Sequence, residues 1–235
     1  MKFTAFSEIL CNVTTRESAG NLAFHVDDYI QTVNANHETL AKNLGFVKDA
    51  LVHMKQIHSD IVHVVTDKDD FSSPPTCDAL VTNKKDVPLM VMVADCTPVL
   101  FFDPAYKAIG VAHAGRAGAF GNIVKNVIDT MAQEYGSKPE NIAVHIGSAI
   151  GVCCYEVGEE IYEESKDEFG YAFEARNGSY YLNINKILLK QLKECGVKAE
   201  NIENEGVCTA CNIQTYFSYR AEGKTGRFAG VLMLK

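Results

Sequence analysis

The sequence predicts an α/β fold in which helices cover β-sheets. Strand-like and helix-like segments are interspersed from one end of the chain to the other, and apolar runs punctuated by proline and glycine are typical of buried strands. The 235 residues are 47% hydrophobic, contain no repeats and no evident linker, and are enough to enclose a sizeable core. We therefore expect a single domain over residues 1–235.

The first half of the chain has one amphipathic helix and is then rich in strands. Apolar side chains recur at helical spacing in residues 27–45 and Gly45 provides a stop, so this segment predicts a helix. His37 lies on its apolar face and is interpreted as a core residue rather than a metal ligand. Buried strands are predicted at 61–65, 87–95, 99–103 and 108–115.

The second half alternates helices with single strands. An amphipathic helix is predicted over 120–136, a polar surface helix over 157–170 and a further amphipathic helix over 183–196. Strands are predicted at 141–147 and 228–234. His145, within the first of these strands, is interpreted in the same way as His37.

Composition excludes several classes of partner and location. The formal net charge is −8 without a long basic block, so we expect no nucleic acid partner. No apolar run is long enough to span a bilayer and the start lacks the features of a secretory signal, so we expect no membrane association and a cytoplasmic protein. The eight cysteines are then expected to be reduced thiols, some of them available as ligands.

Three residues at predicted strand ends have the chemistry of a catalytic metal site. His58 precedes a strand, Cys96 follows one, and His113 lies at the end of another. Strand ends can converge at one edge of a sheet, and two histidines with one thiolate hold zinc while leaving its fourth position open. The spacing matches no compact zinc finger, so the residues alone leave open a core role for each.

The stretch "HAGRAGAFGN" at 113–122 is a candidate anion site. Gly115, Gly118 and Gly121 would let the backbone approach a ligand where a helix begins, and Arg116 would add positive charge. An ordinary strand-to-helix turn is the alternative interpretation.

A "CTAC" segment at 208–211 has the spacing of a zinc knuckle or a redox pair. A structural zinc site needs two further ligands, and Cys153 and Cys154 do not supply them in an obvious spacing. Cys208 and Cys211 are therefore interpreted as structural thiols.

The motifs "QIHSD", "CDALVTN", "ADCTPVLFFDP", "VAHAGRAG", "GSAIGVCCYEVG", "CT", "YFSYR" and "TGR" occur in this order from residue 14 to the closing strand. In this the sequence resembles the YfiH family, also called the laccase-domain or polyphenol oxidase family. The resemblance implies a layered α/β/β/α arrangement with mixed sheets. It also implies that His58, Cys96 and His113 are the metal ligands and the centre of catalysis.

Members of that family have been described as multicopper polyphenol oxidases and as purine nucleoside phosphorylases with adenosine deaminase activity. The second description fits better, because the chain has seven histidines and no His-x-His pair, too few for about four coppers. The resemblance then implies a zinc enzyme that cleaves adenosine, inosine or S-methyl-5'-thioadenosine with phosphate. A copper-dependent (Cu²⁺) phenol oxidase is the alternative, and a cysteine hydrolase using Cys96 and a histidine the third.

The chain also departs from the family pattern. Arg116 stands where tryptophan is common, His37 where arginine is common, and "NIN" at 183–185 where aspartate is frequent. These departures bear on substrate contacts more than on metal binding. The candidate contacts to substrate and phosphate are Arg16, Asn36, Arg116 and Arg220.

Overall fold

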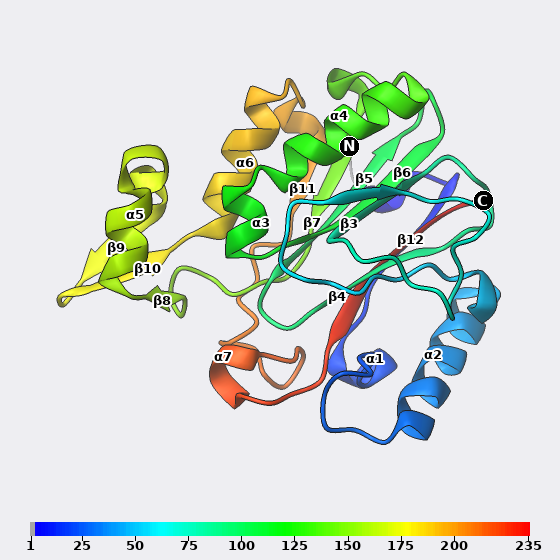
Figure 1. Ribbon diagram of the computed structural model, residues 1–235, viewed down its shortest axis with the longest axis horizontal. Helices are drawn as coiled ribbons and strands as arrows, with labels where there is room; N and C mark the ends of the chain where they lie inside the picture. The colour runs from blue at the N-terminus through cyan, green and yellow to red at the C-terminus, as the bar shows by residue number, and fades with distance from the viewer. Residues whose placement is uncertain (1–2) are drawn as a thin grey trace.

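Two β-sheets lie face to face between layers of helices in the computed structural model, which describes residues 3–235 (Figure 1). The larger sheet has six strands in the order β11-β7-β5-β6-β3-β2. Parallel pairs occur at its two ends, β11 with β7 and β2 with β3, and the pairs between them are antiparallel. The bounds are β2 Val62–Val64, β3 Ala79–Thr82, β5 Thr97–Asp103, β6 Ala108–Ala114, β7 Ala143–Ile146 and β11 Ile202–Asn204.

The second sheet is antiparallel and has the order β1-β12-β4. Its strands are β1 Ile9–Val13, β4 Leu89–Val93 and β12 Phe228–Leu234. All residues of β4 and β12 are buried, as expected for strands that are covered on both faces. One face packs on the larger sheet through a core that includes Val91, Leu100 and Phe228.

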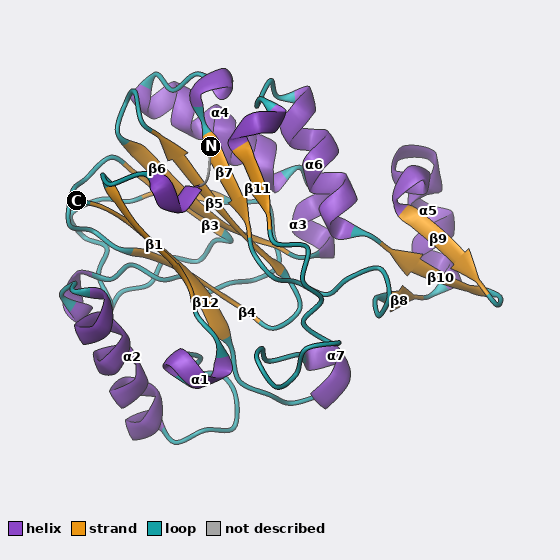
Figure 2. Cartoon of the chain, turned by 180° about the vertical axis from the view of Figure 1, so that it is seen from behind, coloured by secondary structure: helices purple, strands orange, loops and turns teal. Residues whose placement is uncertain are grey.

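Helices cover the outer face of each sheet (Figure 2). The side chains of α4 and α6 pack on the larger sheet around Val127, Leu188 and Phe101, and α2 packs on the smaller sheet around Leu40 and Val231. The order of layers is thus α/β/β/α, which confirms the predicted mixed-sheet architecture. The helices are α1 Arg16–Ala19, α2 Ile30–Leu44, α3 Arg116–Phe120, α4 Ile123–Tyr135, α5 Glu159–Phe169, α6 Ile184–Glu194 and α7 Tyr219–Glu222.

A small third sheet with α5 projects to one side of the layered body (Figure 1). Its antiparallel strands, in the order β8-β10-β9, are β8 Glu156–Val157, β9 Phe173–Arg176 and β10 Ser179–Leu182. The remaining short elements are the 3₁₀ helices Phe3–Ala5, Lys48–Ala50, Pro139–Asn141, Gly170–Ala172 and Ala199–Asn201. Within residues 3–235, every helix is too short or too polar to cross a bilayer.

Local sequence explains where the main helices begin and end. The α2 helix ends at Gly45, which adopts φ 77° in the left-handed region that glycine enters without strain. Asn183 begins α6, because its side chain accepts a hydrogen bond from the backbone N–H of Lys186. The departure "NIN" therefore supplies a helix cap. His37 is fully buried and its Nε2 lies 2.8 Å from the carbonyl of Leu22, which confirms its interpretation as a core residue.

Candidate metal centre and substrate cavity

The three predicted ligands meet at one edge of the six-stranded sheet. His58 precedes β2, Cys96 precedes β5 and His113 lies near the end of β6. Since β5 is antiparallel to β6, its start lies beside the end of β6, where Pro98 pairs with His113. β2 is parallel to β3, and β3 is antiparallel to β6, so the start of β2 lies at the same edge.

These side chains are close enough to share one metal ion. One ligand atom from each of His58, Cys96 and His113 lies within 4.8 Å of the others, and the two imidazole centroids are 4.7 Å apart. Gly115 leaves room for the thiol, because a Cβ there would lie 2.9 Å from Cys96 Sγ. His58 and Asp95 adopt φ of 59° and 92°, a strained conformation that turns His58 and Cys96 toward the common point.

A fully buried carboxylate, Asp78, holds two of the three ligands in place. It accepts hydrogen bonds from the backbone N–H groups of Ile57, His58 and Ser59 and from Ser59 Oγ, at 2.7 to 3.1 Å. Its Oδ1 also accepts from His113 Nδ1 at 2.8 Å, which leaves Nε2 as the nitrogen available to a metal. Such carboxylate–histidine pairs orient metal ligands and raise their basicity.

The ionisation of the cluster prepares the thiolate ligand, whereas His113 has to release a proton when a metal binds. Burial would raise the pKa of the Cys96 thiol, but the charge of His113 and hydrogen bonds from His113 and His58 lower it to about 6. Burial would lower the pKa of His113, but the charges and hydrogen bonds of Cys96 and Asp78 raise it to about 9. In the metal-free protein Cys96 is therefore a thiolate near neutral pH, and the thiolate is the form that binds metals.

The donor set fits one zinc ion and leaves a further coordination position open. A cluster of several coppers would need more histidines at the same place. The ring nitrogens of four others already pair with carbonyl or carboxylate oxygens: His37 with Leu22, His53 with Phe71, His63 with Asp69 and His145 with Glu205. Within the described chain, the His58–Cys96–His113 group is the one cluster that contains histidines.

A cavity of about 390 Å³ opens over this centre. Its size is in the range of sites for small molecules and cofactors. Besides the three ligands, the wall contains apolar, aromatic and cationic side chains, chief among them Met92, Ile150, Ile184, Tyr155, Tyr219, Arg116, Arg220 and Arg227.

Two of the four predicted substrate contacts line this cavity, Arg116 in α3 and Arg220 in α7. The backbone N–H of Arg220 donates to Asp95 Oδ2 at 2.6 Å, and its guanidinium donates to the carbonyl of Glu156 at 2.8 Å. The carboxylate of Asp95 also accepts from Thr209 Oγ1 at 2.6 Å. Asp95, the residue before Cys96, thus positions α7 and Arg220 at the cavity wall.

The other two lie outside the cavity wall. Arg16 forms an ion pair with Glu222 at 2.7 Å and its guanidinium lies over the ring of Phe217. Asn36 donates to the carbonyl of Asn21 at 2.8 Å. Both side chains form contacts within the protein and lie away from the cavity, so no role in substrate binding is assigned to them.

The glycines of the 113–122 loop act differently from the expected anion cradle. A Cβ at Gly118 would lie 3.1 Å from the carbonyl oxygen of Ser59, and one at Gly121 would lie 2.9 Å from Asp60 Cβ. These glycines allow the segment that carries His58 to pack against the loop. Arg116 is the residue of the predicted anion site that places positive charge at the cavity.

Sequence reasoning missed Asp78, His25 and Arg227. His25 and Arg227 line the cavity, and Asp78 lies behind the ligands. Asp78 and Arg227 belong to the motifs "CDALVTN" and "TGR", so the signal was present without a role attached to it. His25 lies in no motif. Burial, followed by the charges of Arg227 and His58, lowers its pKa, so that its ring is neutral near pH 7.

Four of the cysteines outside this centre lie together, which corrects the interpretation of the "CTAC" segment. Contrary to the interpretation from spacing, Cys153 and Cys154 do approach the "CTAC" pair: the sulfur atoms of Cys153, Cys154, Cys208 and Cys211 all lie within 4.8 Å of one another. We refer to these residues as the four-cysteine cluster.

Asp78→Asn is expected to weaken metal binding about 10–100-fold, as loss of a carboxylate behind a ligand does. An amide in this position turns an N–H group toward buried donors, so we also expect a loss of about 3 kcal/mol of unfolding free energy. Metal affinity by competition with a chromophoric chelator, together with denaturant unfolding, measures both effects.

The matched control for this substitution is Asp69→Asn. Asp69 also pairs with a histidine, His63, at 2.9 Å, but away from the cavity. It is expected to keep the affinity of the wild type. Equal losses of affinity in the two variants would contradict a specific role for Asp78.

The chain is similar to known proteins in both sequence and fold. A purine nucleoside phosphorylase of Corynebacterium glutamicum is 38% identical over 91% of this chain and 86% of its own length, and one of Streptomyces coelicolor is 36% identical over 91% and 87%. The crystal structure of Bacillus licheniformis YfiH matches with a TM-score of 0.93 and 30% identity, over 98% of this chain and 94% of that one. The profile of the family described as multi-copper polyphenol oxidoreductase laccase matches residues 12–235. The chain therefore belongs to this laccase-like YfiH family.

Proposed function

We propose that the protein is a zinc-dependent purine nucleoside phosphorylase. It would convert adenosine, inosine or S-methyl-5'-thioadenosine and phosphate into the free base and a pentose 1-phosphate, with deamination of adenosine as a second activity. The observation that carries this proposal is one cavity of nucleoside size that has both a three-ligand metal centre and three arginines in its wall. The names of the relatives in Corynebacterium and Streptomyces support the same reaction.

The arginines account for the use of phosphate. In phosphorolysis a phosphate oxygen bonds to the anomeric carbon while the bond from that carbon to the purine nitrogen breaks and the departing base takes up a proton. Arg116, Arg220 and Arg227 place positive charge around the cavity, where it would hold the phosphate dianion beside the sugar. The protein as a whole has a net charge of −8, so this local positive charge is needed to attract the anion.

The remaining wall suits the nucleoside. Met92, Ile150 and Ile184 provide apolar surface, and Tyr155 and Tyr219 provide aromatic faces on which a purine can stack. Tyr219 is 61% exposed, so it lies where an entering base would first make contact.

His58, Cys96 and His113 would hold the zinc ion. When bound, zinc supplies Lewis-acid polarisation of an oxygen of phosphate, water or substrate. The chain's own contribution is to fix the ligands: Asp78 holds His113 in the tautomer with Nδ1 protonated and anchors the backbone around His58.

Copper-dependent oxidation of phenols is the second candidate. It is favoured by the description of the family as multi-copper, and by the fact that two imidazoles with one thiolate also bind copper. A cysteine hydrolase is the third candidate, because the Cys96 thiol lies beside two imidazoles that could act as its base. The engagement of four other histidines elsewhere favours the phosphorylase over the oxidase.

The decisive experiment combines metal analysis with product analysis. Protein purified without added metal is assayed with adenosine in the presence and absence of phosphate, and again after chelation and reloading with zinc or with copper. We expect adenine and ribose 1-phosphate as the main products, restored by zinc, with inosine as a slower product. Phenol oxidation that requires copper, without any dependence on phosphate, would support the oxidase instead. Hydrolysis by the chelated protein would support the cysteine hydrolase.

We also propose that the protein is located in the cytoplasm. All eight cysteines are unpaired, which is the form that a reducing compartment maintains.

A further inference from the structure

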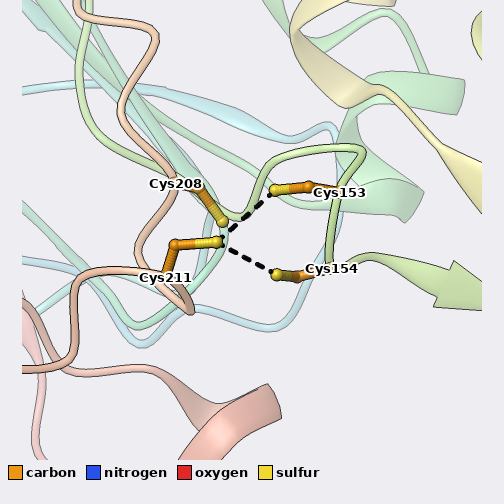
Figure 3. Close-up of side chains that lie close together, drawn as sticks. All are labelled: Cys153, Cys154, Cys208 and Cys211. Atoms are coloured by element: carbon orange, nitrogen blue, oxygen red, sulfur yellow. Dashed lines mark hydrogen bonds between the residues drawn. The ribbon is translucent and has the colours of Figure 1, made fainter.

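Two loops bring four thiols together outside the metal centre. Cys153 and Cys154 lie in the loop between β7 and β8, and Cys208 and Cys211 lie in the loop between β11 and α7. In Figure 3 the side chains of the two loops point toward one another from opposite sides. Cys153 and Cys211 are exposed and the other two are half-buried, so the cluster is accessible from solvent.

The spacing of the sulfur atoms is that of a tetrahedral metal site. Cys211 Sγ lies 3.7 Å from Cys153 Sγ and 3.4 Å from Cys154 Sγ. Four thiolates bound to zinc at about 2.3 Å in a tetrahedron lie about 3.8 Å from one another. A disulfide requires sulfur atoms about 2.0 Å apart and joins only two of them, whereas Cys211 is nearly equidistant from two partners.

The backbone holds the two loops in this arrangement. Ala149 donates to the carbonyl of Val207 at 3.2 Å and its own carbonyl accepts from the N–H of Thr209 at 3.0 Å, which fixes one loop against the other. The N–H of Gly151 donates to Cys208 Sγ at 3.2 Å, a contact that suits a thiolate. Gly151 also permits the close approach, since a Cβ there would lie 3.1 Å from Cys153 Sγ.

The positively charged side chain of Arg220 contacts the loop that carries Cys154. Zinc with four thiolates carries a net charge of −2, which a positive group nearby would offset. The guanidinium of Arg220 reaches the carbonyls of Cys154 and Glu156 at 3.4 and 2.8 Å. The loop of Cys154 also carries Ile150 and Tyr155 of the cavity wall.

We propose that the four-cysteine cluster binds a second zinc ion, in a closed structural site separate from the His58–Cys96–His113 centre. Four thiolates occupy all four positions of a tetrahedral zinc ion, so the site has no position for a water ligand. The ion joins the loop before β8 to the loop before α7. It thereby fixes the segments that carry Tyr155 and Arg220 into the cavity wall.

Metal content of the intact protein, purified under reducing conditions, tests this proposal. We expect two zinc ions per wild-type chain by mass spectrometry of the elements, and the loss of one in Cys211→Ala and in Cys153→Ala. Both side chains are exposed, so their removal leaves no buried void. Cys195→Ala, which removes a thiol outside both clusters, is the matched control and should keep both ions.

The retained ion shows whether the variants fold. Cys211→Ala should keep the zinc of the His58 centre, whereas Cys96→Ala should lose that ion and keep the other. Cobalt bound to Cys96→Ala should then show the strong sulfur-to-cobalt charge-transfer absorption of a four-thiolate site. The proposal fails if the wild type holds only one zinc ion and Cys211→Ala retains it, if the four-cysteine cluster holds iron or copper instead, or if native mass spectrometry finds a disulfide among the four cysteines.

Discussion

Cys96→Ser is expected to lower kcat/KM for phosphorolysis by at least about 10³-fold, while the fold remains intact. The substitution replaces the one thiolate of the centre with a hydroxyl that stays protonated and binds zinc weakly. A metal that stabilises charge in the transition state contributes several kcal/mol, and about 4 kcal/mol corresponds to this factor. The zinc content should fall by one ion per chain, whatever the number bound by the wild type.

Two further measurements separate this expectation from its alternatives. The unfolding free energies of the two metal-free proteins should agree within about 1 kcal/mol, or about 2–4 °C in the midpoint. Cys195→Ser, at the end of α6, changes a thiol of intermediate burial away from the centre and should keep full activity. An inactive Cys96→Ser that keeps its full complement of zinc would identify Cys96 as a nucleophile instead of a ligand.

The sequence revealed the parts of the fold that have strong local signals. The helix Ile30–Leu44 and the buried strands at Leu89–Val93 and Thr97–Asp103 have long periodic or continuous apolar patterns. The first two lie within their predicted ranges, and the third begins before its predicted range of 99–103. Strands β1, β3 and β8 to β11 were not predicted. Strands β8 to β11 are two to four residues long and mostly half-buried or exposed, so they have no clear apolar pattern. Such strands are defined by pairing with distant segments, which the sequence does not display.

The sequence likewise indicated some residues of the candidate sites and gave no sign of how others come together. The positions of His58, Cys96 and His113 at predicted strand ends indicated that they could converge, and the resemblance to the YfiH family identified them as a ligand set. The four-cysteine cluster could not, because Cys154 and Cys208 are brought together by loop–loop hydrogen bonds that depend on the register of β7 and β11. Arg16 has the residue type of an anion contact, but its ion pair with Glu222 is visible only in three dimensions.

The two sites are joined through the cavity wall. Asp95, next to Cys96, accepts from Thr209 and Arg220, and its carbonyl accepts from the N–H of Ile150 at 2.8 Å. Thr209 lies between Cys208 and Cys211 and donates to Asp95, so it links the four-cysteine cluster to the segment that carries Cys96. A disturbance of the cluster should therefore reach Arg220 through a few short contacts, without altering the three ligands of the centre.

Arg116→Ala is expected to raise KM for phosphate by about 10–100-fold and to change deamination of adenosine little. The guanidinium lines the cavity at the start of α3, directly after the strand that carries His113. One charge-assisted hydrogen bond contributes about 1.5–3 kcal/mol, which corresponds to this range. Deamination does not use phosphate, so it serves as an internal control.

Arg116→Lys should recover part of the affinity for phosphate, because an ammonium keeps the charge but loses the planar fork that matches phosphate. Lys125→Ala removes an exposed cation of α4 that pairs with Asp129 and should behave as the wild type. If Arg116→Ala instead lowers both reactions equally, Arg116 does not act through phosphate, and the anion must be held by Arg220 and Arg227.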